Sequence, residues 1–200
     1  MGRAMSRAST SDAKPAHPDA PARATAALPE AGRLPATDPC GHFGLGIARD
    51  GTWYYHGSPI GRKAIAKLFA RVLRREDDGS YWLVTPAERG RIDVEDAPFV
   101  AVALDVRQAE GRQQLVFTTN LDDEVVAGPE HRLWLEPPPA GAAEGEGGAP
   151  YLHVRRGLNA RLTPAVWYQL AELAVTEETP EGPKLGVWSD GVFFPLAEAE

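Results

Sequence analysis

Residues 58–75 read SPIGRKAIAKLFARVLRR and decide how the N-terminal part of the chain folds. Apolar residues recur here at the spacing of one helix face, which predicts an amphipathic helix. Ser58 suits the N-cap and Pro59 the first helical position, where the missing proline N–H costs nothing. We expect Leu68 and Phe69 to anchor the helix in the core. The whole apolar face consists of Ile65, Leu68, Phe69, Val72 and Leu73.

The opposite face of the predicted helix carries only cations, namely Arg62, Lys63, Lys67, Arg71, Arg74 and Arg75. Because a helix N-terminus is itself partly positive, Arg62 and Lys63 in the first turn cost stability, which a bound phosphate or carboxylate would relieve. Two interpretations stay open: an anion-binding site, or a solvated face with acidic side chains from elsewhere nearby. The cations at the C-terminal end suit the helix dipole and need no functional explanation.

The composition is that of a soluble, acidic protein. The chain has 200 residues, of which 43% are hydrophobic, and a net charge of −7, which suits one or two domains with a sizeable core. The acidic balance argues against general nucleic-acid binding. The single cysteine, Cys40, cannot form an internal disulfide, which fits a cytoplasmic location. No apolar run predicts a membrane span, and no apolar segment near the N-terminus predicts a secretory signal.

Composition also divides the chain into a leader and two modules. Residues 1–39 contain almost nothing large and apolar, so they cannot bury enough surface to fold, and we expect them to be disordered. A first module at 40–92 and a second at 93–196 follow. Residues 136–150 combine three consecutive prolines with Ala, Gly and Glu and are expected to form a flexible loop.

Two Asp-Gly turns, each between β-forming segments, predict two hairpins. The first is Arg49-Asp50-Gly51-Thr52-Trp53-Tyr54 and the second is Ser189-Asp190-Gly191-Val192-Phe193-Phe194. Each hairpin neighbours a helix that opens with Ser-Pro or Thr-Pro. The similarity leaves open whether the chain contains a structural duplication or a chance recurrence of a common turn.

Two further helix-start signals follow the first helix. Thr85-Pro86-Ala87-Glu88 has capping-box spacing and predicts one helical turn that ends at Gly90. Thr163-Pro164 predicts a second long helix, whose apolar face carries Val166, Leu170 and Leu173. The remaining patterns are mainly those of strands. We therefore expect an α+β fold of two small modules: a hairpin, helix and strands first, then an antiparallel sheet with one helix.

The residues that carry chemistry form no complete catalytic or cofactor signature. Asp93, Glu95 and Asp96 could hold a metal or serve as acid and base, but a solvated strand face or ion pairs with Arg62 and Lys63 explain them as well. Neither a phosphate-binding glycine loop nor a nucleophile elbow is present. The sequence indicates no cofactor and no metal site, and it leaves open whether any reaction is catalysed.

Five motifs in order make the chain similar to the bacterial family known as domain of unknown function 1285, from about Cys40 to Leu196. The motifs are Asp50-Gly51-Thr52-Trp53-Tyr54, Gly57-Ser58-Pro59-Ile60, Leu83-Val84-Thr85-Pro86, Val94-Glu95-Asp96-Ala97-Pro98-Phe99 and Ala127-Gly128-Pro129-Glu130-His131. The resemblance implies a duplicated core and a C-terminal half that resembles the pleckstrin-homology fold. It also implies a ligand site at the junction of the halves, for a nucleotide-like molecule in signalling.

We therefore expect a cytoplasmic binding module that senses a small anionic or nucleotide-like ligand between its two modules. The candidate residues are Ser58, Gly61, Arg62, Lys63, Thr85, Glu95, Asp96 and His131. The N–H groups near Gly61 would hold the anion together with Arg62 and Lys63. Thr85, Glu95, Asp96 and His131 match the family's motifs and would bind the polar edge of the ligand.

Three alternatives to this site remain. The chain is a metal-dependent enzyme acting on phosphate esters, with Asp93, Glu95 and Asp96 recruiting the metal. It is a protein-interaction adaptor that binds a protein partner and no small ligand. At the level of single residues, Arg62 is a structural ion-pair partner of Glu95 or Asp96 rather than a ligand-binding group.

Overall fold

The computed structural model describes residues 41–137 and 148–199, which belong to one compact unit, residues 33–200. The predicted leader, residues 1–39, lies outside the described residues, as does most of the predicted loop at 136–150. The two ends of that predicted loop are strand: Glu136 closes β10 and Ala149 opens β11.

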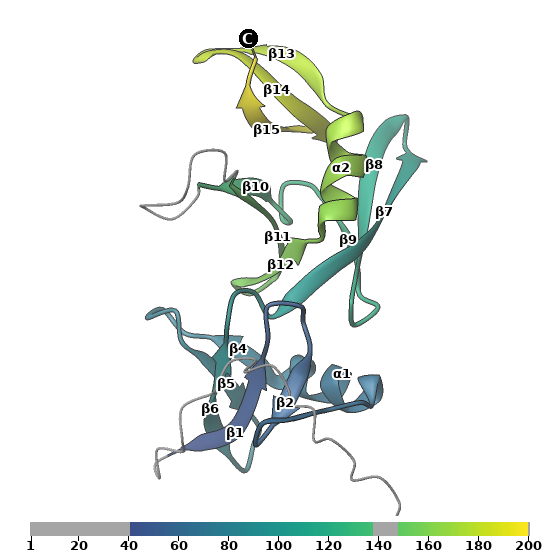
Figure 1. Cartoon of the computed structure of the whole chain (residues 1–200). Helices are drawn as coiled ribbons and strands as arrows, with labels where there is room; N and C mark the ends of the chain where they lie inside the picture. Colours follow the sequence, from purple (N-terminus) through teal and green to yellow (C-terminus); the bar gives the residue numbers. More distant parts are fainter. Residues whose placement is uncertain (1–40, 138–147, 200) are drawn as a thin grey trace, which may run out of the picture. The chain divides into compact units, whose positions relative to one another are not determined.

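The first sheet is formed by the N-terminal part of the chain (Figure 1). Its strand order is β3-β2-β1-β6-β5-β4, so two antiparallel three-stranded meanders meet at the parallel pair β1–β6. Helix α1 (Lys63–Val72) connects the two meanders. The strands are β1 (His42–Ile47), β2 (Trp53–Tyr55), β3 (Ser58–Pro59), β4 (Leu73–Arg75), β5 (Tyr81–Val84) and β6 (Arg89–Val94).

The second sheet has the order β10-β11-β12-β7-β8-β9 and is mixed rather than purely antiparallel, because β12 pairs in parallel with β7. Its strands are β7 (Phe99–Ala109), β8 (Arg112–Thr119), β9 (Glu124–Val126), β10 (Leu133–Glu136), β11 (Ala149–Arg155) and β12 (Leu158–Leu162). Helix α2 (Pro164–Glu172) follows. A third, antiparallel sheet then contains β13 (Val175–Thr179), β14 (Gly182–Ser189) and β15 (Val192–Glu198).

The predicted start of the first helix is wrong. Ser58 and Pro59 form β3, which pairs with Tyr55 and Tyr54, and the helix begins only at Lys63 with Arg62 as its N-cap. The cause is the turn before them: positive φ values at His56 (46°) and Gly57 (78°) reverse the chain and continue the hairpin. Proline is tolerated there because β3 is an edge strand.

The predicted helical turn at residues 85–88 is also wrong. Thr85 and Glu88 do form the hydrogen bond that the capping box implies, from Glu88 N–H to Thr85 Oγ1 at 3.0 Å. No helix follows, because Arg89 and Gly90 pair with Val84 and Leu83 as β6. The segment is therefore the turn between β5 and β6, and strand pairing has overridden the local helix signal.

Helix α1 packs through small residues rather than through the predicted large ones. Ala66 and Ala70 are buried, whereas Leu68 is 59% exposed, so the expectation that Leu68 anchors the helix is wrong. Phe69 does pack against the core, with its ring 6.0 Å from that of Trp53. The buried face of the helix is therefore centred on Ala66 and Ala70, whose small side chains allow close approach.

The predictions for α2 and for the two Asp-Gly hairpins are confirmed. Thr163 is the N-cap of α2, with its side chain accepting from Val166 N–H, and proline occupies the first turn. Val166 and Leu170 are buried, as the predicted apolar face requires. The turns at Gly51 and Gly191 connect β1 to β2 and β14 to β15.

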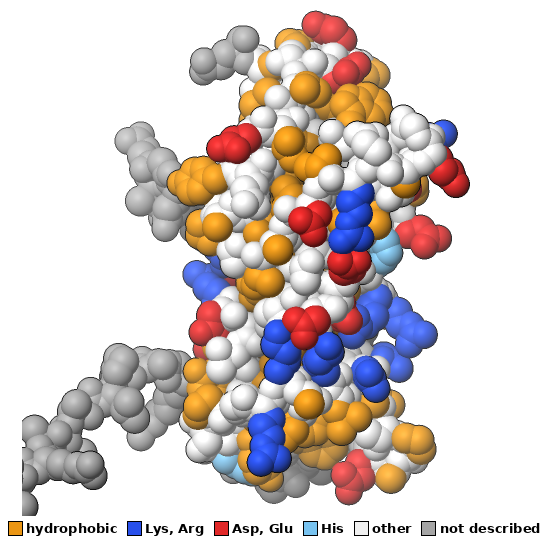
Figure 2. All heavy atoms as spheres, turned by 90° about the vertical axis from the view of Figure 1, so that its right-hand side faces the viewer, with side chains coloured by type: hydrophobic (Ala, Val, Ile, Leu, Met, Phe, Trp, Pro, Cys, Tyr) orange, Lys and Arg blue, Asp and Glu red, His pale blue; other side chains and the backbone are white. Residues whose placement is uncertain are grey.

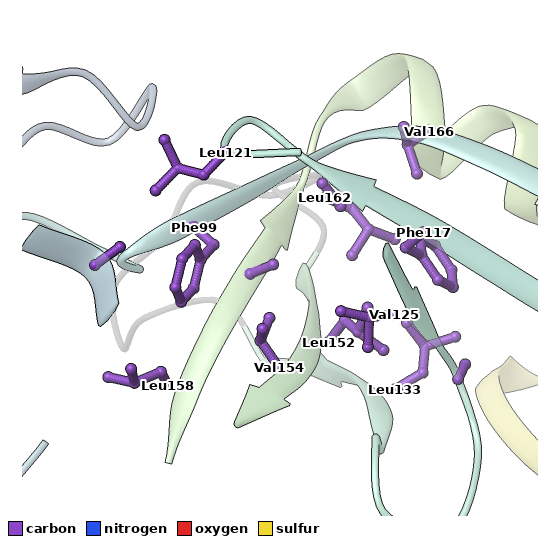
Figure 3. Close-up of a cluster of buried hydrophobic side chains, with 14 of the residues drawn as sticks. Phe99, Phe117, Leu121, Val125, Leu133, Leu152, Val154, Leu158, Leu162 and Val166 are labelled. Carbon is purple, nitrogen blue, oxygen red and sulfur yellow. The ribbon is translucent and has the colours of Figure 1, made fainter. Parts of the chain in front are cut away.

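One hydrophobic cluster connects the elements. Figure 3 shows that the second sheet and α2 direct large apolar side chains toward one another. The labelled members are Phe99, Phe117, Leu121, Val125, Leu133, Leu152, Val154, Leu158, Leu162 and Val166. Neither helix in the described ranges has the length and the apolar run that crossing a bilayer would demand.

The first hairpin turn contacts the end of β8. Asn120 donates through Nδ2 to the Gly51 carbonyl at 3.1 Å and accepts from Val100 N–H at 3.1 Å. Gly51 has a φ of +82°, and a Cβ there would lie 2.4 Å from Asn120 Nδ2. Only glycine therefore fits this turn.

The packing of α1 gives the first test. Phe69→Ala should lower the free energy of unfolding by about 2–4 kcal/mol, because it removes a ring that packs on Trp53. Leu68→Ala, one residue away, should change it by less than about 0.5 kcal/mol, because that side chain is exposed. Urea denaturation of both variants measures the difference, and equal losses would contradict the orientation described for α1.

Candidate functional site

A hollow of about 300 Å³ lies between the loop that leads into β10 and strand β15. Strands β10 and β15 are edge strands of two different sheets (Figure 1). Residues of the two strands are in contact. We call this hollow the β10–β15 groove. It is lined by Gly128, Pro129, Arg132, Leu133, Trp134, Val192, Phe193, Phe194 and Pro195.

The loop side of the groove is held by backbone bonds and by a histidine. Gly128 N–H donates to the His131 carbonyl at 3.1 Å, and His131 N–H donates to the Gly128 carbonyl at 3.2 Å. His153 accepts through Nε2 from Gly157 N–H, so its proton is on Nδ1, which donates to the Glu130 carbonyl at 2.8 Å. The Gly128–His131 bonds close the loop on itself, and the bond from His153 attaches the loop to β11.

The β15 side of the groove is held by Ser189, which is fully buried. Its hydroxyl accepts from Leu115 N–H at 2.9 Å and donates to the Ala127 carbonyl at 2.6 Å. The turn that carries β15 is thereby tied both to β8 and to the loop that starts at Ala127. Gln113 adds a bond from Nε2 to the Trp188 carbonyl at 2.8 Å.

Three aromatic residues line the groove, Trp134, Phe193 and Phe194, and the rings of Trp134 and Phe193 are each supported by a second ring. Trp134 stacks on Tyr151 with ring centres 5.7 Å apart, and Phe193 packs on Trp188 at 5.4 Å. Such pairs hold their rings in place beyond what burial alone provides. Arg132 is the only charged residue that lines the groove; it is exposed, and no ion pair joins it to another described residue.

The acidic candidates lie elsewhere and are held by arginines. Asp96, whose side chain is 10% exposed, is bound by Arg161 and lies 3.4 Å from Arg49 Nε. It also accepts a hydrogen bond from the Tyr151 hydroxyl. Glu95 accepts from Arg49 N–H at 2.9 Å. Neither acid pairs with Arg62 in the part of the chain that the structure describes, so the alternative that made Arg62 their structural partner is wrong; the ion pairs of Asp96 are with Arg161 and Arg49.

Asp93, the third acid of this motif, lies 3.2 Å from Nε2 of His42. The geometry does not make this contact a hydrogen bond, since the buried Asp93 Oδ2 has no hydrogen-bond partner. Within residues 41–137 and 148–199, no three His, Cys, Asp or Glu side chains gather in a way that would hold a metal ion.

The cations of α1 face a carboxylate from the other part of the chain. Lys63 and Lys67 lie 2.8 and 3.3 Å from the two oxygens of Asp122. Their hydrogen bonds, that of Lys63 first, lower the pKa of Asp122. Figure 2 shows acidic side chains among the Lys and Arg side chains on this side of the molecule. Arg62 is exposed, with no ion pair among the described residues.

The predicted site residues therefore do not form one described site. Glu95 and Asp96 share Arg49, while Lys63 is bound to Asp122. His131 lies beside the groove, in the loop before Arg132, and its ring is 6.0 Å from that of His153. Of the others, Ser58 lies in β3, Gly61 and Arg62 precede α1, and Thr85 closes the β5–β6 turn.

Sequence reasoning did not find Arg132, Trp134 or Phe193. The signal available was weak: a cation two residues before an aromatic strand residue. Trp134 and Phe193 come from different sheets, and the contact between β10 and β15 is a tertiary one. Periodicity in either segment carries no information on that contact.

Fold and groove together describe a β-rich protein of two modules with a small-molecule-sized hollow in the second. Residues 35–97 match the model "Domain of unknown function (DUF1285), N-terminal domain", and residues 98–196 match "Protein of unknown function (DUF1285), C-terminal domain". The chain belongs to the DUF1285 family. No curated protein matches the sequence.

Two solved structures of this family are similar to the chain. A DUF1285 family protein from Silicibacter pomeroyi DSS-3 is 41% identical with a TM-score of 0.70, over 80% of this chain and 82% of that one. A DUF1285 family protein from Shewanella baltica OS155 is 29% identical with a TM-score of 0.48, over 64% of this chain and 91% of that one.

Tyr151 gives a test of the Asp96 cluster by pH. Burial first, and then the hydrogen bond to Asp96, raise the pKa of Tyr151 from 10.0 to about 12. A raised folded-state pKa favours the neutral phenol, so its contribution to stability is complete below pH 10 and is lost as the pH rises through 12. Tyr151→Phe should flatten this loss in denaturation curves across that window. An unchanged pH dependence would contradict the raised pKa of Tyr151.

Ser189 gives a test of the groove's framework. Ser189→Ala leaves the Leu115 N–H and the Ala127 carbonyl without their partner in a buried place, which should cost about 2–4 kcal/mol of unfolding free energy. Ser58→Ala is the matched control, because that hydroxyl is exposed, and it should cost less than about 0.5 kcal/mol. If Ser58→Ala instead lowers the free energy of unfolding by about 1 kcal/mol, the loss would match that of a helix N-cap and would contradict the placement of Ser58 in β3.

Proposed function

We propose that this protein is a binding module for a small organic anion, which it holds in the β10–β15 groove. The observation that carries the proposal is the exposed guanidinium of Arg132 at the rim of an otherwise apolar, aromatic-lined hollow. Ligand sites are typically concave and mostly apolar, with a few polar groups that orient the ligand. The volume of about 300 Å³ is at the lower end of their range.

Arginine suits this role better than the cations of α1. Its planar fork can bind a carboxylate or a phosphate through two parallel hydrogen bonds. Lys63 and Lys67 are engaged by Asp122, and a ligand would have to displace that carboxylate. No ion pair joins Arg132 to another described residue, so a ligand there would displace no described carboxylate. This favours the groove over the first turn of α1 as the anion site.

A nucleotide-like ligand fits the same groove, since a base would lie on an aromatic ring while Arg132 binds a phosphate. We propose that such a ligand acts as a signal in the bacterial cytoplasm. This retains the ligand class expected from the family resemblance. It moves the site from the junction of the modules to the second module.

We also infer that the two six-stranded sheets descend from a duplication. Each consists of two three-stranded meanders, and in each the first strand pairs in parallel with the last. The packing of α2 against β7, after the last strand of the second sheet, supports a pleckstrin-homology-like architecture for the C-terminal part. Folds of that kind serve as binding modules, but function rests on the site rather than on the fold.

A protein-interaction adaptor is the second candidate. Tyr168 on α2 is 69% exposed, and Val102 and Val106 on β7 are each 48% exposed. Because α2 packs against β7, these side chains belong to neighbouring elements. Exposed apolar side chains grouped in this way are typical of protein contact surfaces.

The test is a thermal-shift screen with nucleotides, phosphorylated sugars and small carboxylic acids. A ligand present at 100 times its dissociation constant should add about 2.7 kcal/mol of stability. Arg132→Ala should abolish the shift. Arg71→Ala removes an equal charge from the exposed side of α1 and should leave the shift unchanged.

Two outcomes would contradict the proposal. The absence of a shift with any compound, while a protein partner binds through Tyr168, would favour the adaptor. Loss of binding in Arg62→Ala, with retention in Arg132→Ala, would return the anion site to the start of α1.

A further inference from the structure

We infer that the β10–β15 groove selects ligands with one anionic group and a flat aromatic ring, with the ring against Trp134 and Phe193 and the anionic group on Arg132. This inference rests on the proposed function and adds the chemical class of the ligand. It follows from the ring contacts, the hydrogen bonds and the charge of the residues that line the groove.

The rings that line the groove are positioned before any ligand arrives. Trp134 lies nearly parallel to Tyr151, at 25°, so one face of the indole is covered by the second ring. Trp188, on the other strand of its hairpin, packs on Phe193 at a tilt of 50°. Little side-chain entropy remains to be lost on binding, and such preorganisation increases affinity.

Several polar atoms beside these rings are already engaged. The indole N–H of Trp134 donates to Glu136 Oε2 at 3.0 Å. The backbone groups of Gly128 and His131 bond to each other. A ligand made mainly of hydroxyl groups, such as a sugar, would lose hydration at each hydroxyl that faces an engaged group or an apolar side chain. The face of a flat ring has no hydrogen bond to water to lose when it enters an apolar lining.

The charge of the lining sets the charge of the ligand. Arg132 is the only cation that lines the groove, and Glu136 holds a carboxylate on the Trp134 indole. One guanidinium matches one carboxylate or one phosphate. A ligand with several phosphates would bring its further charges near Glu136, so a triphosphate should bind no better than a monophosphate.

The experiment compares probes that share an anion and differ in the ring, titrated calorimetrically into the full chain. One pair is AMP and ribose 5-phosphate, and the other is benzoate and cyclohexanecarboxylate. The ring-bearing member of at least one pair should bind about tenfold more tightly or better, the scale of one stacked ring. Whether the AMP pair or the benzoate pair shows the effect distinguishes a nucleotide from an aromatic carboxylic acid.

Variants of Trp134 and Phe193 test whether these two rings cause the preference for ring-bearing ligands. Trp134→Leu and Phe193→Leu should each reduce the ring preference severalfold, while Trp134→Phe should keep most of it. Circular dichroism and the melting temperature show whether each variant is folded. Because Trp134→Phe retains an aromatic ring, preserved preference there separates ring contact from general packing.

Each remaining outcome overturns a defined part of the inference. Equal affinity within both pairs, with the Arg132 dependence intact, would leave anion binding in place and overturn the ring selectivity. ATP binding more tightly than AMP would overturn the restriction to a single anionic group. Binding of a proline-rich peptide, with none of the acids bound, would assign the aromatic groove to peptides and would also end the proposed function.

Discussion

The parallel pairing of β7 with β12 is the constraint on which the second module depends. In the described residues, each six-stranded sheet consists of two meanders whose backbones are joined by one parallel strand pair. In the second sheet this pair includes Phe99, Ala101, Ala160 and Leu162, all at most 2% exposed. Strand β10 is fixed on one side of the pair, and β8, which holds the β14–β15 hairpin through Ser189, on the other. The dimensions of the groove therefore follow from the register of two strands that do not line it.

The elements that the sequence predicts well are those whose cause is local. The turn at Gly51 and the start of α2 at Thr163 each follow from a short motif whose hydrogen bonds lie within a few residues. The predicted start of α1 at Ser58 and the predicted helical turn after Thr85 are wrong, because strand pairing competes with helix capping at both places. A cap provides about 1 kcal/mol, which the pairing of a hairpin can outweigh.

The same distinction between local and tertiary causes applies to the candidate site. An ion pair for Asp96 could be predicted, since a carboxylate in a half-apolar segment needs a cation, but Arg161 as its partner could not. The groove is less accessible still to sequence reasoning, because Trp134 and Phe193 meet only through the contact of two edge strands from separate sheets. Its residues have ordinary strand patterns, and nothing in either segment distinguishes a ring that lines a hollow from one in the core.

The parallel pairs also determine the order in which the protein can be completed during synthesis. Strand β1 can form its parallel pair only when β6, up to Val94, has left the ribosome. In the same way, β7 can form its parallel pair only after β12 has been synthesised. Until then each sheet has an open central edge, which is a template for pairing with other chains. The groove is completed last, since its second wall is β15. A nascent chain thus closes its first sheet long before the groove is complete, and a chain cut short after α2 would keep that sheet but lack the β15 side of the groove.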